Sequence, residues 1–271
     1  MRIGIVAPSG RIGPGAAEQV KALASARNDV DLIFGAQCFL SHNHFAGSDA
    51  ERLRAFVNMA NDPGVDALWF ARGGYGACRI AQEAVAALGP AARNKAYLGY
   101  SDGGYLLAAL YRAGFPVVAH GPMPQDVARD GGAAAVGRAL DWLSRRAPET
   151  VEASLSAGDS HAAFNITVLG LLLGTPLEPS LEGHVLLLED VAEHAYRIDR
   201  ALFHITSQPA LRRVAGIRLG RVSDIPPNNP DFGATPEEIV RYWCTRSGIP
   251  FLGRADIGHD SGNKVVPFGR L

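Results

Sequence analysis

The chain has 271 residues, of which 47% are hydrophobic and 20% charged. This composition is typical of a globular protein and too apolar for a disordered chain. The 26 basic and 27 acidic side chains leave a formal net charge of −1, which excludes the basic footprint of a nucleic-acid-binding protein.

The first 145 residues alternate between strand-like and helix-like segments. We expect strands at residues 3–7, 30–34, 67–71, 96–100 and 117–120. We expect helices at residues 16–26, 48–61, 78–88, 105–113 and 133–145, the second opened by a capping box of Ser48 and Glu51. This alternation predicts an N-terminal α/β domain with a parallel sheet flanked by helices. Ligands of such sheets bind at the carboxyl ends of the strands.

The second half of the chain has a less regular pattern. A linker is expected at residues 146–150, followed by strands near 151–155, 185–188, 216–219 and 251–252. Helices fit residues 167–173, 195–206 and 236–247. Because strands and helices do not alternate simply here, we expect a second, smaller α+β domain over residues 151–271.

The sequence gives little sign of metals, disulfides or membranes. Cys38, Cys78 and Cys244 lack C-x-x-C spacing, which argues against a disulfide framework and a zinc site. His42 and His44 have no nearby carboxylate or cysteine, so no metal or cofactor is expected. The apolar runs are too short for a signal peptide or a membrane span. We therefore expect a soluble cytoplasmic protein without a membrane or nucleic-acid partner.

The segment from Gly99 to Gly104 lies between a predicted strand and a predicted helix. Ser101 at this turn can expose its hydroxyl as a nucleophile, and the N–H groups of the helix N-terminus can stabilise an oxyanion. The alternative is that Ser101 only caps the helix. The local sequence leaves both interpretations open.

A glycine-rich loop, Arg72-Gly73-Gly74-Tyr75-Gly76, directly follows the strand expected at residues 67–71. Such a loop can present backbone N–H groups to an anion, although it matches neither the dinucleotide nor the P-loop pattern. A simple turn is the alternative. Both loops should lie at the same edge of the sheet.

Two further segments contain a carboxylate and a histidine in suggestive positions. Glu189 and Asp190 follow an apolar strand, where a carboxylate can orient an imidazole or simply end the strand. His259 follows a predicted strand in the second half, and His120 follows a strand of the first sheet. Both histidines are candidates for a general base.

Taken in order, these segments resemble a known family. Five further segments also fit it: Ile5-Val6-Ala7-Pro8-Ser9-Gly10, His120-Gly121-Pro122-Met123, Asn165 before Leu173-Gly174-Thr175-Pro176, Tyr196-Arg197-Ile198-Asp199-Arg200 and Gly258-His259. The set is similar to the LD-carboxypeptidases, serine peptidases that include muramoyltetrapeptide carboxypeptidases and microcin C self-immunity peptidases. The resemblance covers nearly the whole chain.

The resemblance implies a two-domain α/β fold, a homodimer, and a triad of Ser101, His259 and Glu189 that needs no metal or cofactor. It places the oxyanion donors at the N–H groups of Asp102 and Gly74. The implied reaction removes the terminal D-alanine from a murein tetrapeptide.

Five residues within the matched motifs are candidates for contacts with the substrate: Arg72, Gly73, Tyr75, Asn165 and Arg197. Arg72 and Arg197 are the candidates for binding the free carboxylate. Two alternatives remain at this point: a microcin C-type amidase that cleaves acyl-aspartyl nucleotides, and a non-catalytic domain that binds a small ligand.

Overall fold

The N-terminal part of the chain forms a six-stranded sheet, as the alternating pattern predicts. The computed structural model describes residues 1–271, and the strands run in the order β10-β5-β4-β3-β1-β2. The strands are β1 (Arg2–Val6), β2 (Asp31–Phe34), β3 (Ala67–Phe70), β4 (Ala96–Gly99), β5 (Val117–His120) and β10 (Val266–Pro267). All neighbours are parallel except β10, which pairs antiparallel with β5.

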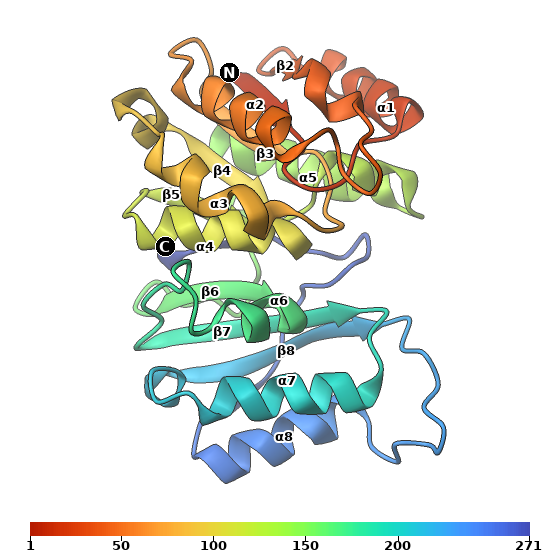
Figure 1. Ribbon diagram of the computed structural model, residues 1–271, viewed down its shortest axis with the longest axis vertical. Coiled ribbons are helices and arrows are strands. Elements are labelled where there is room, and N and C mark those ends of the chain that lie inside the picture. The colour runs from red at the N-terminus through yellow and green to blue at the C-terminus, as the bar shows by residue number, and fades with distance from the viewer.

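Helices cover this sheet (Figure 1). They are α1 (Pro14–Ser25), α2 (Asp49–Asn61), α3 (Ala77–Ala86), α4 (Gly104–Arg112) and α5 (Gly132–Arg145). The expected capping box starts α2, because Ser48 Oγ accepts a hydrogen bond from the Glu51 N–H and Glu51 accepts one from the Ser48 N–H. Short 3₁₀ turns at Ser101–Gly103 (η3) and Pro124–Ala128 (η4) follow β4 and β5.

The C-terminal part forms a second sheet, of five strands in the order β11-β6-β7-β8-β9. Its strands are β6 (Ser160–Asn165), β7 (His184–Val191), β8 (Gly216–Ser223), β9 (Phe251–Arg254) and β11 (Gly269–Arg270). Its helices are α6 (Ile166–Leu172), α7 (Ala195–Ser207) and α8 (Pro236–Ser247). The four strands β6 to β9 are parallel, and β11 is antiparallel to β6.

The mixed α/β class is confirmed, but the first strand of the C-terminal part was wrongly placed. Residues 151–155 form turns with a single bridge from Val151 to Val265, because the Glu152 side chain folds back onto the N–H of Ser154. The strand is Ser160–Asn165 instead. With it, strands and helices alternate from β6 to β9, so this part is more regular than the expected α+β arrangement.

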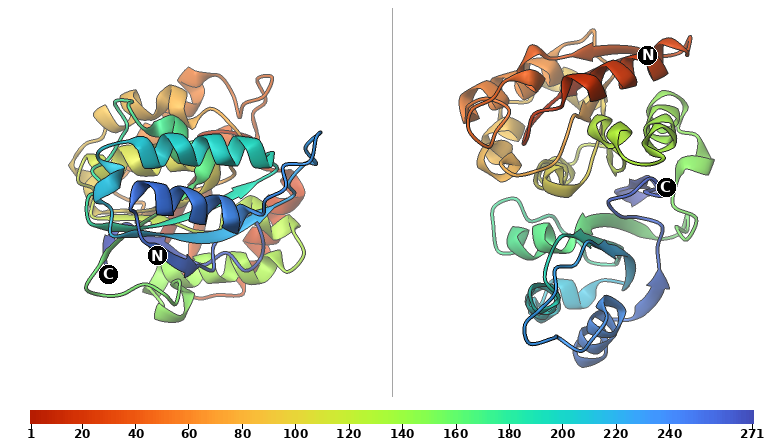
Figure 2. Two further views of the ribbon diagram at one scale, coloured as in Figure 1. Left: turned by 90° about the horizontal axis from the view of Figure 1, so that it is seen from below. Right: turned by 90° about the vertical axis from the view of Figure 1, so that its right-hand side faces the viewer.

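The end of the chain contributes to both sheets. After β9 it returns to the N-terminal part, where β10 pairs with β5, and then β11 pairs with β6 (Figure 2). The chain therefore passes between the two parts twice. It first does so near the expected linker at residues 146–150, and residues 255–266 then lead back from the C-terminal part to the N-terminal part.

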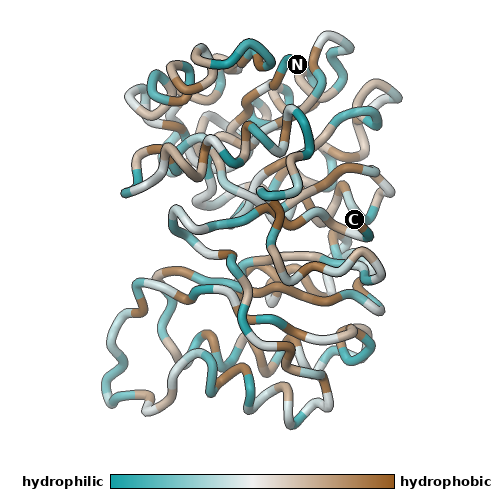
Figure 3. The backbone as a smooth tube through the Cα atoms, turned by 180° about the vertical axis from the view of Figure 1, so that it is seen from behind, coloured by the Kyte–Doolittle hydropathy of each residue, from teal (hydrophilic) through white to brown (hydrophobic).

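The two parts share a continuous apolar core. Helix α4 lies between the sheets, and every residue from Gly104 to Leu110 is buried. A Cβ at Gly104 would lie 3.2 Å from Val168 and 3.6 Å from Phe164, so α4 approaches β6 and α6 closely. Hydrophobic residues are concentrated in the central strands, and hydrophilic residues are concentrated in the outer loops and helices (Figure 3). No helix combines the length and the apolar sequence that a membrane span requires.

Candidate active site

Ser101 lies in a strained turn between β4 and α4. Its φ of 56° is in the left-handed region, which residues other than glycine rarely adopt. A Cβ at Gly99 or at Gly103 would meet the Phe70 side chain at 2.5 or 2.9 Å, so both positions require glycine. Gly99-Tyr100-Ser101-Asp102-Gly103 has the G-x-S-x-G spacing of a nucleophile elbow.

The Asp102 side chain ties this turn to two other loops. It is buried, and its Oδ2 accepts hydrogen bonds from the Ala77 N–H at 2.8 Å and from the Ser9 hydroxyl. Burial raises the pKa of Asp102, although these hydrogen bonds oppose the shift. Buried Arg52 joins the same two loops, because it donates to the carbonyls of Pro8 and Gly76. The loops that follow β1, β3 and β4 are thus fixed relative to one another.

The glycine-rich loop lies directly against Ser101. A Cβ at Gly73 would stand 2.9 Å from Ser101 Oγ, and Gly74 has a φ of 112°. Arg72 lines the same cavity as Ser101, and its guanidinium donates only to the Arg11 carbonyl, at 3.3 Å. Tyr75 is 48% exposed and lies outside that cavity, against Phe45.

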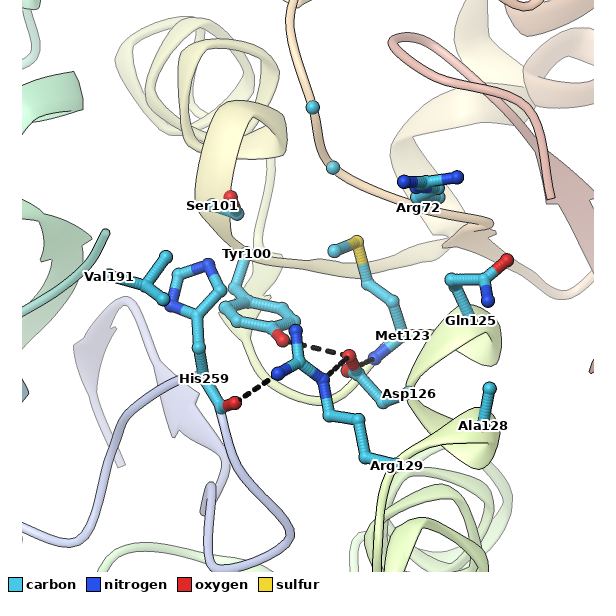
Figure 4. Close-up of a pocket in the computed structure, with 12 residues that line it drawn as sticks. Arg72, Tyr100, Ser101, Met123, Gln125, Asp126, Ala128, Arg129, Val191 and His259 are labelled. Carbon is cyan, nitrogen blue, oxygen red and sulfur yellow. Dashed lines mark hydrogen bonds and ion pairs between the residues drawn. The ribbon is translucent and has the colours of Figure 1, made fainter. Parts of the chain in front are cut away.

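His259 and Glu189 form a buried pair. The distance from His259 Nδ1 to Glu189 Oε2 is 2.6 Å, and Glu189 is fully buried near the carboxyl end of β7. Because an ionised carboxylate only accepts, we assign the proton to Nδ1. This leaves Nε2 free, on the side of the ring that faces Ser101 (Figure 4).

The pKa of His259 is raised above its ordinary value. Burial, the largest single influence, lowers it, but the charge of Glu189 and the hydrogen bond to Glu189 outweigh burial. The second carboxylate oxygen of Glu189 is buried and has no hydrogen-bond partner.

Asp190 and Asn165 belong to a neighbouring structural network. Asp190 accepts hydrogen bonds from the side chains of Asn165 and Thr167, at 2.8 and 2.9 Å. Burial and the charge of Glu189 raise the pKa of Asp190 to about 6. Asn165 Oδ1 also caps α6 through the N–H of Val168. Neither Asp190 nor Asn165 lines the cavity that contains Ser101.

Neither Arg197 nor His120 lines the cavity that contains Ser101. Arg197 is on α7, pairs with Glu193 at 3.4 Å and lines a different hollow. His120 is buried, and its Nε2 lies 3.1 Å from Asn263 Oδ1. Burial lowers the pKa of His120 to about 4, so this histidine is neutral at physiological pH.

Ser101 and His259 open onto a shared cavity of about 450 Å³. They lie at one end of it in Figure 4, with Arg72 and Gln125 at the other. The remaining lining residues are Gly73, Gly74, Tyr100, Met123, Asp126, Ala128, Arg129 and Val191. Nowhere do three or more His, Cys, Asp or Glu side chains gather as a metal site.

Sequence reasoning missed the part of the cavity wall formed by residues 123–129. These residues begin three positions after the end of β5, at the same sheet edge as Ser101 and the glycine-rich loop. The rule that ligands bind at the carboxyl ends of parallel strands was therefore a signal that could have identified them.

Comparison with known proteins identifies both halves of the chain. Residues 3–121 match the model of the LD-carboxypeptidase N-terminal domain, and residues 162–271 match that of the LD-carboxypeptidase C-terminal domain.

Named relatives cover almost the whole chain. A putative carboxypeptidase of Streptomyces coelicolor is 34% identical, over 99% of this chain and 88% of its own length. The murein tetrapeptide carboxypeptidase of Pseudomonas aeruginosa is 26% identical, over 99% of this chain and 91% of its own.

Two solved structures share the fold. The muramoyltetrapeptide carboxypeptidase of Oxalobacter formigenes is 24% identical with a TM-score of 0.80, over 98% of this chain and 93% of that one. A microcin C7 self-immunity protein in complex with aspartyl sulfamoyl adenosine is 17% identical with a TM-score of 0.81. The match covers 99% of this chain and 91% of that one.

Proposed function

This chain belongs to the LD-carboxypeptidase family, and from that premise we propose that it is a serine carboxypeptidase releasing the terminal D-alanine of murein tetrapeptides. One observation carries the proposal. Ser101, in a strained turn, and His259, paired with buried Glu189, open onto one cavity although they are 158 positions apart in the chain. Such an arrangement suits acyl transfer through a covalent intermediate.

In the proposed reaction, Ser101 Oγ attacks the scissile carbonyl carbon while His259 Nε2 takes the hydroxyl proton. Glu189 holds the imidazole through Nδ1 and stabilises the imidazolium as it forms. His259 then gives its proton to the leaving amine, and D-alanine departs. Water, activated by His259, hydrolyses the acyl-enzyme and restores the Ser101 hydroxyl.

The oxyanion formed by this attack needs N–H donors beside Ser101. We assign them to the backbone N–H groups of Asp102 and Gly74. The close approach of Gly73 to Ser101 Oγ, at 2.9 Å for an added Cβ, supports a role for this loop. In a comparable hydrolase one such donor is worth about 3 kcal/mol of transition-state stabilisation.

The free carboxylate of the substrate needs a cation, and we assign this role to Arg72. Its guanidinium lies in the cavity with no carboxylate partner. Arg197, the other candidate, lines a different hollow.

The lining of the cavity favours a peptide over an aminoacyl nucleotide. A nucleobase would be expected to stack on an exposed aromatic side chain. Tyr100 is the only Phe, Tyr or Trp in the lining, and it is 2% exposed. Trp69 and Trp142 are buried elsewhere, and Trp243 packs against Phe203.

Incubation with disaccharide-tetrapeptide tests the proposal, with free D-alanine measured by mass spectrometry. We expect stoichiometric release by the native protein and none by Ser101→Ala. An aspartyl sulfamoyl adenosine analogue with a hydrolysable acyl bond serves as the competing substrate. Preferential cleavage of the nucleotide would contradict the assignment to murein peptides.

A fluorophosphonate probe distinguishes the enzyme from a non-catalytic binding domain. We expect one covalent adduct, located at Ser101 by peptide mapping. By the same family resemblance we propose a cytoplasmic homodimer that acts in peptidoglycan recycling, which cell fractionation and light scattering would check.

A further inference from the structure

A chain of contacts links the residue before Ser101 to the backbone of His259. The Tyr100 hydroxyl donates to Asp126 Oδ1 at 2.9 Å, and Arg129 Nε donates to the same carboxylate oxygen at 3.1 Å. Arg129 Nη1 in turn donates to the main-chain carbonyl of His259. Tyr100, Asp126 and Arg129 all come from the N-terminal part, whereas His259 comes from the C-terminal part.

The Tyr100 ring contacts the imidazole as well. The two ring centroids are 4.8 Å apart, and Figure 4 shows the Tyr100 ring beside His259, with Asp126 and Arg129 beyond its hydroxyl. Asp126 is buried, and its second oxygen is held by the N–H of Met123 at 2.8 Å. Each oxygen of Asp126 therefore already accepts a hydrogen bond from within the protein, as expected of a group with a structural role.

We propose that Tyr100, Asp126 and Arg129 are positioning residues that fix His259 against Ser101 across the boundary between the two parts. The proposal rests on the proposed function, because it takes His259 as the general base. The hydroxyl of Tyr100 acts through Asp126 on Arg129, and Arg129 acts on the His259 carbonyl. Catalytic geometry is sensitive at this point, since misplacing a reacting group by about 1 Å can cost about 100-fold in rate.

Arg129 also affects the imidazole electrostatically. The charged and titratable groups that face His259 are Glu189 on β7, Asp126 and Arg129 at η4, and His120 on β5. The positive charge of Arg129 lowers the pKa of His259, whereas the charges of Glu189 and Asp126 raise it. Tyr100 carries no charge, because burial keeps the pKa of its hydroxyl well above 10.

Three variants separate geometry from charge. Arg129→Lys keeps the charge, but an ammonium group cannot reproduce the fork that joins Asp126 to the His259 carbonyl. We expect kcat to fall about 10- to 100-fold, with the acid limb of kcat/KM unmoved. Arg129→Gln should lower kcat similarly and also move the acid limb to higher pH. Tyr100→Phe should lower kcat less and leave the acid limb in place.

A double variant tests whether the residues act as one unit. Because Tyr100 is proposed to act through Arg129, Tyr100→Phe/Arg129→Gln should be no slower than Arg129→Gln alone. Arg145→Gln is the matched control. Arg145 also belongs to the N-terminal part, but it pairs with Asp141 and Glu149 and does not line the cavity. We expect Arg145→Gln to keep the native rate, and all variants are compared by thermal melting.

The outcomes are distinguishable. If the native protein shows no Ser101-dependent release of D-alanine, the proposed function fails. If the native protein is active, and folded Arg129→Gln or Arg129→Lys raises KM with kcat unchanged, Arg129 binds substrate and the positioning role is overturned. Independent, multiplicative effects in the double variant would overturn it as well.

Discussion

Replacing Glu189 by glutamine tests the electrostatic centre of the proposed mechanism. The amide has two orientations in this buried position. If its NH₂ group takes the place of Oε2, it donates to His259 Nδ1 and forces the ring proton onto Nε2, which then cannot accept the Ser101 proton. If its carbonyl oxygen takes that place, the NH₂ group occupies the site of Oε1, which is buried and has no partner.

The magnitude of the effect follows from that geometry. An unpartnered buried N–H group costs about 1–3 kcal/mol, so the second orientation is disfavoured. Neither orientation supplies the negative charge that stabilises the imidazolium at 2.6 Å. In a comparable triad the corresponding acid-to-amide change lowers kcat about 10⁴-fold, or about 5 kcal/mol. We expect a loss of this order for Glu189→Gln.

The assay is release of D-alanine under saturating substrate, with a melting curve for each protein. The control is Asp190→Asn, the same type of change one position along β7, where the carboxylate instead holds Asn165 and Thr167. We expect Asp190→Asn to change melting temperature more than kcat. A normal kcat for Glu189→Gln, together with a large loss for Asp190→Asn, would refute the reasoning and assign the orienting role to Asp190.

Four further predictions follow from the cavity. Ser101→Ala should lower kcat about 10⁶-fold without unfolding the protein, as loss of the nucleophile does in comparable triads; residual turnover above contamination, or failure of the variant to fold, would contradict this. The acid limb of kcat/KM should have its midpoint above the ordinary histidine value of about 6.5, because the pKa of His259 is raised and only neutral imidazole accepts a proton. His259→Ala should abolish turnover, whereas His120→Ala should keep both the rate and the acid limb. The reverse pattern would make His120 the base. Gly73→Ala should lower kcat about 100-fold, since its Cβ would press on Ser101 Oγ at 2.9 Å, while Gly15→Ala on α1, with nothing within 4 Å, should be silent. Dialysis against EDTA should leave activity unchanged, and loss that zinc restores would overturn the metal-free mechanism.

Much of the N-terminal sheet could be predicted from the sequence because its signals are local. Short, mostly apolar strands of four or five residues alternate with amphipathic helices, and Ser48 with Glu51 marks the start of α2. The C-terminal part was harder for a physical reason. The strand β6 begins with Ser160 and His161 and is only weakly apolar, so it gave no clear pattern, whereas residues 151–155 look strand-like but are drawn into turns by Glu152.

The site was predictable where residues directly follow a strand and unpredictable where it depends on tertiary contact. Glu189 could be identified as a candidate because it comes directly after the apolar residues of β7. Its contact with His259 could not, because a separation of 70 positions in the sequence says nothing about the distance between two side chains. Asn165 and Arg197 fit the family pattern, but their places in the fold depend on the capping of α6 and on an ion pair along α7. The link from Arg129 to the His259 carbonyl leaves no sequence signal at all.

The return of the chain end to both sheets has a consequence for protein synthesis. The segment carrying His259, β10 and β11 leaves the ribosome after every other strand, and chains emerge at about 5–20 residues per second. Until then β5 and β6 each have an unpaired edge, of the kind that templates aggregation, and Ser101 lacks its proposed base. On the proposed mechanism, docking of this one segment would therefore supply the base of Ser101 and cover both strand edges in the same step.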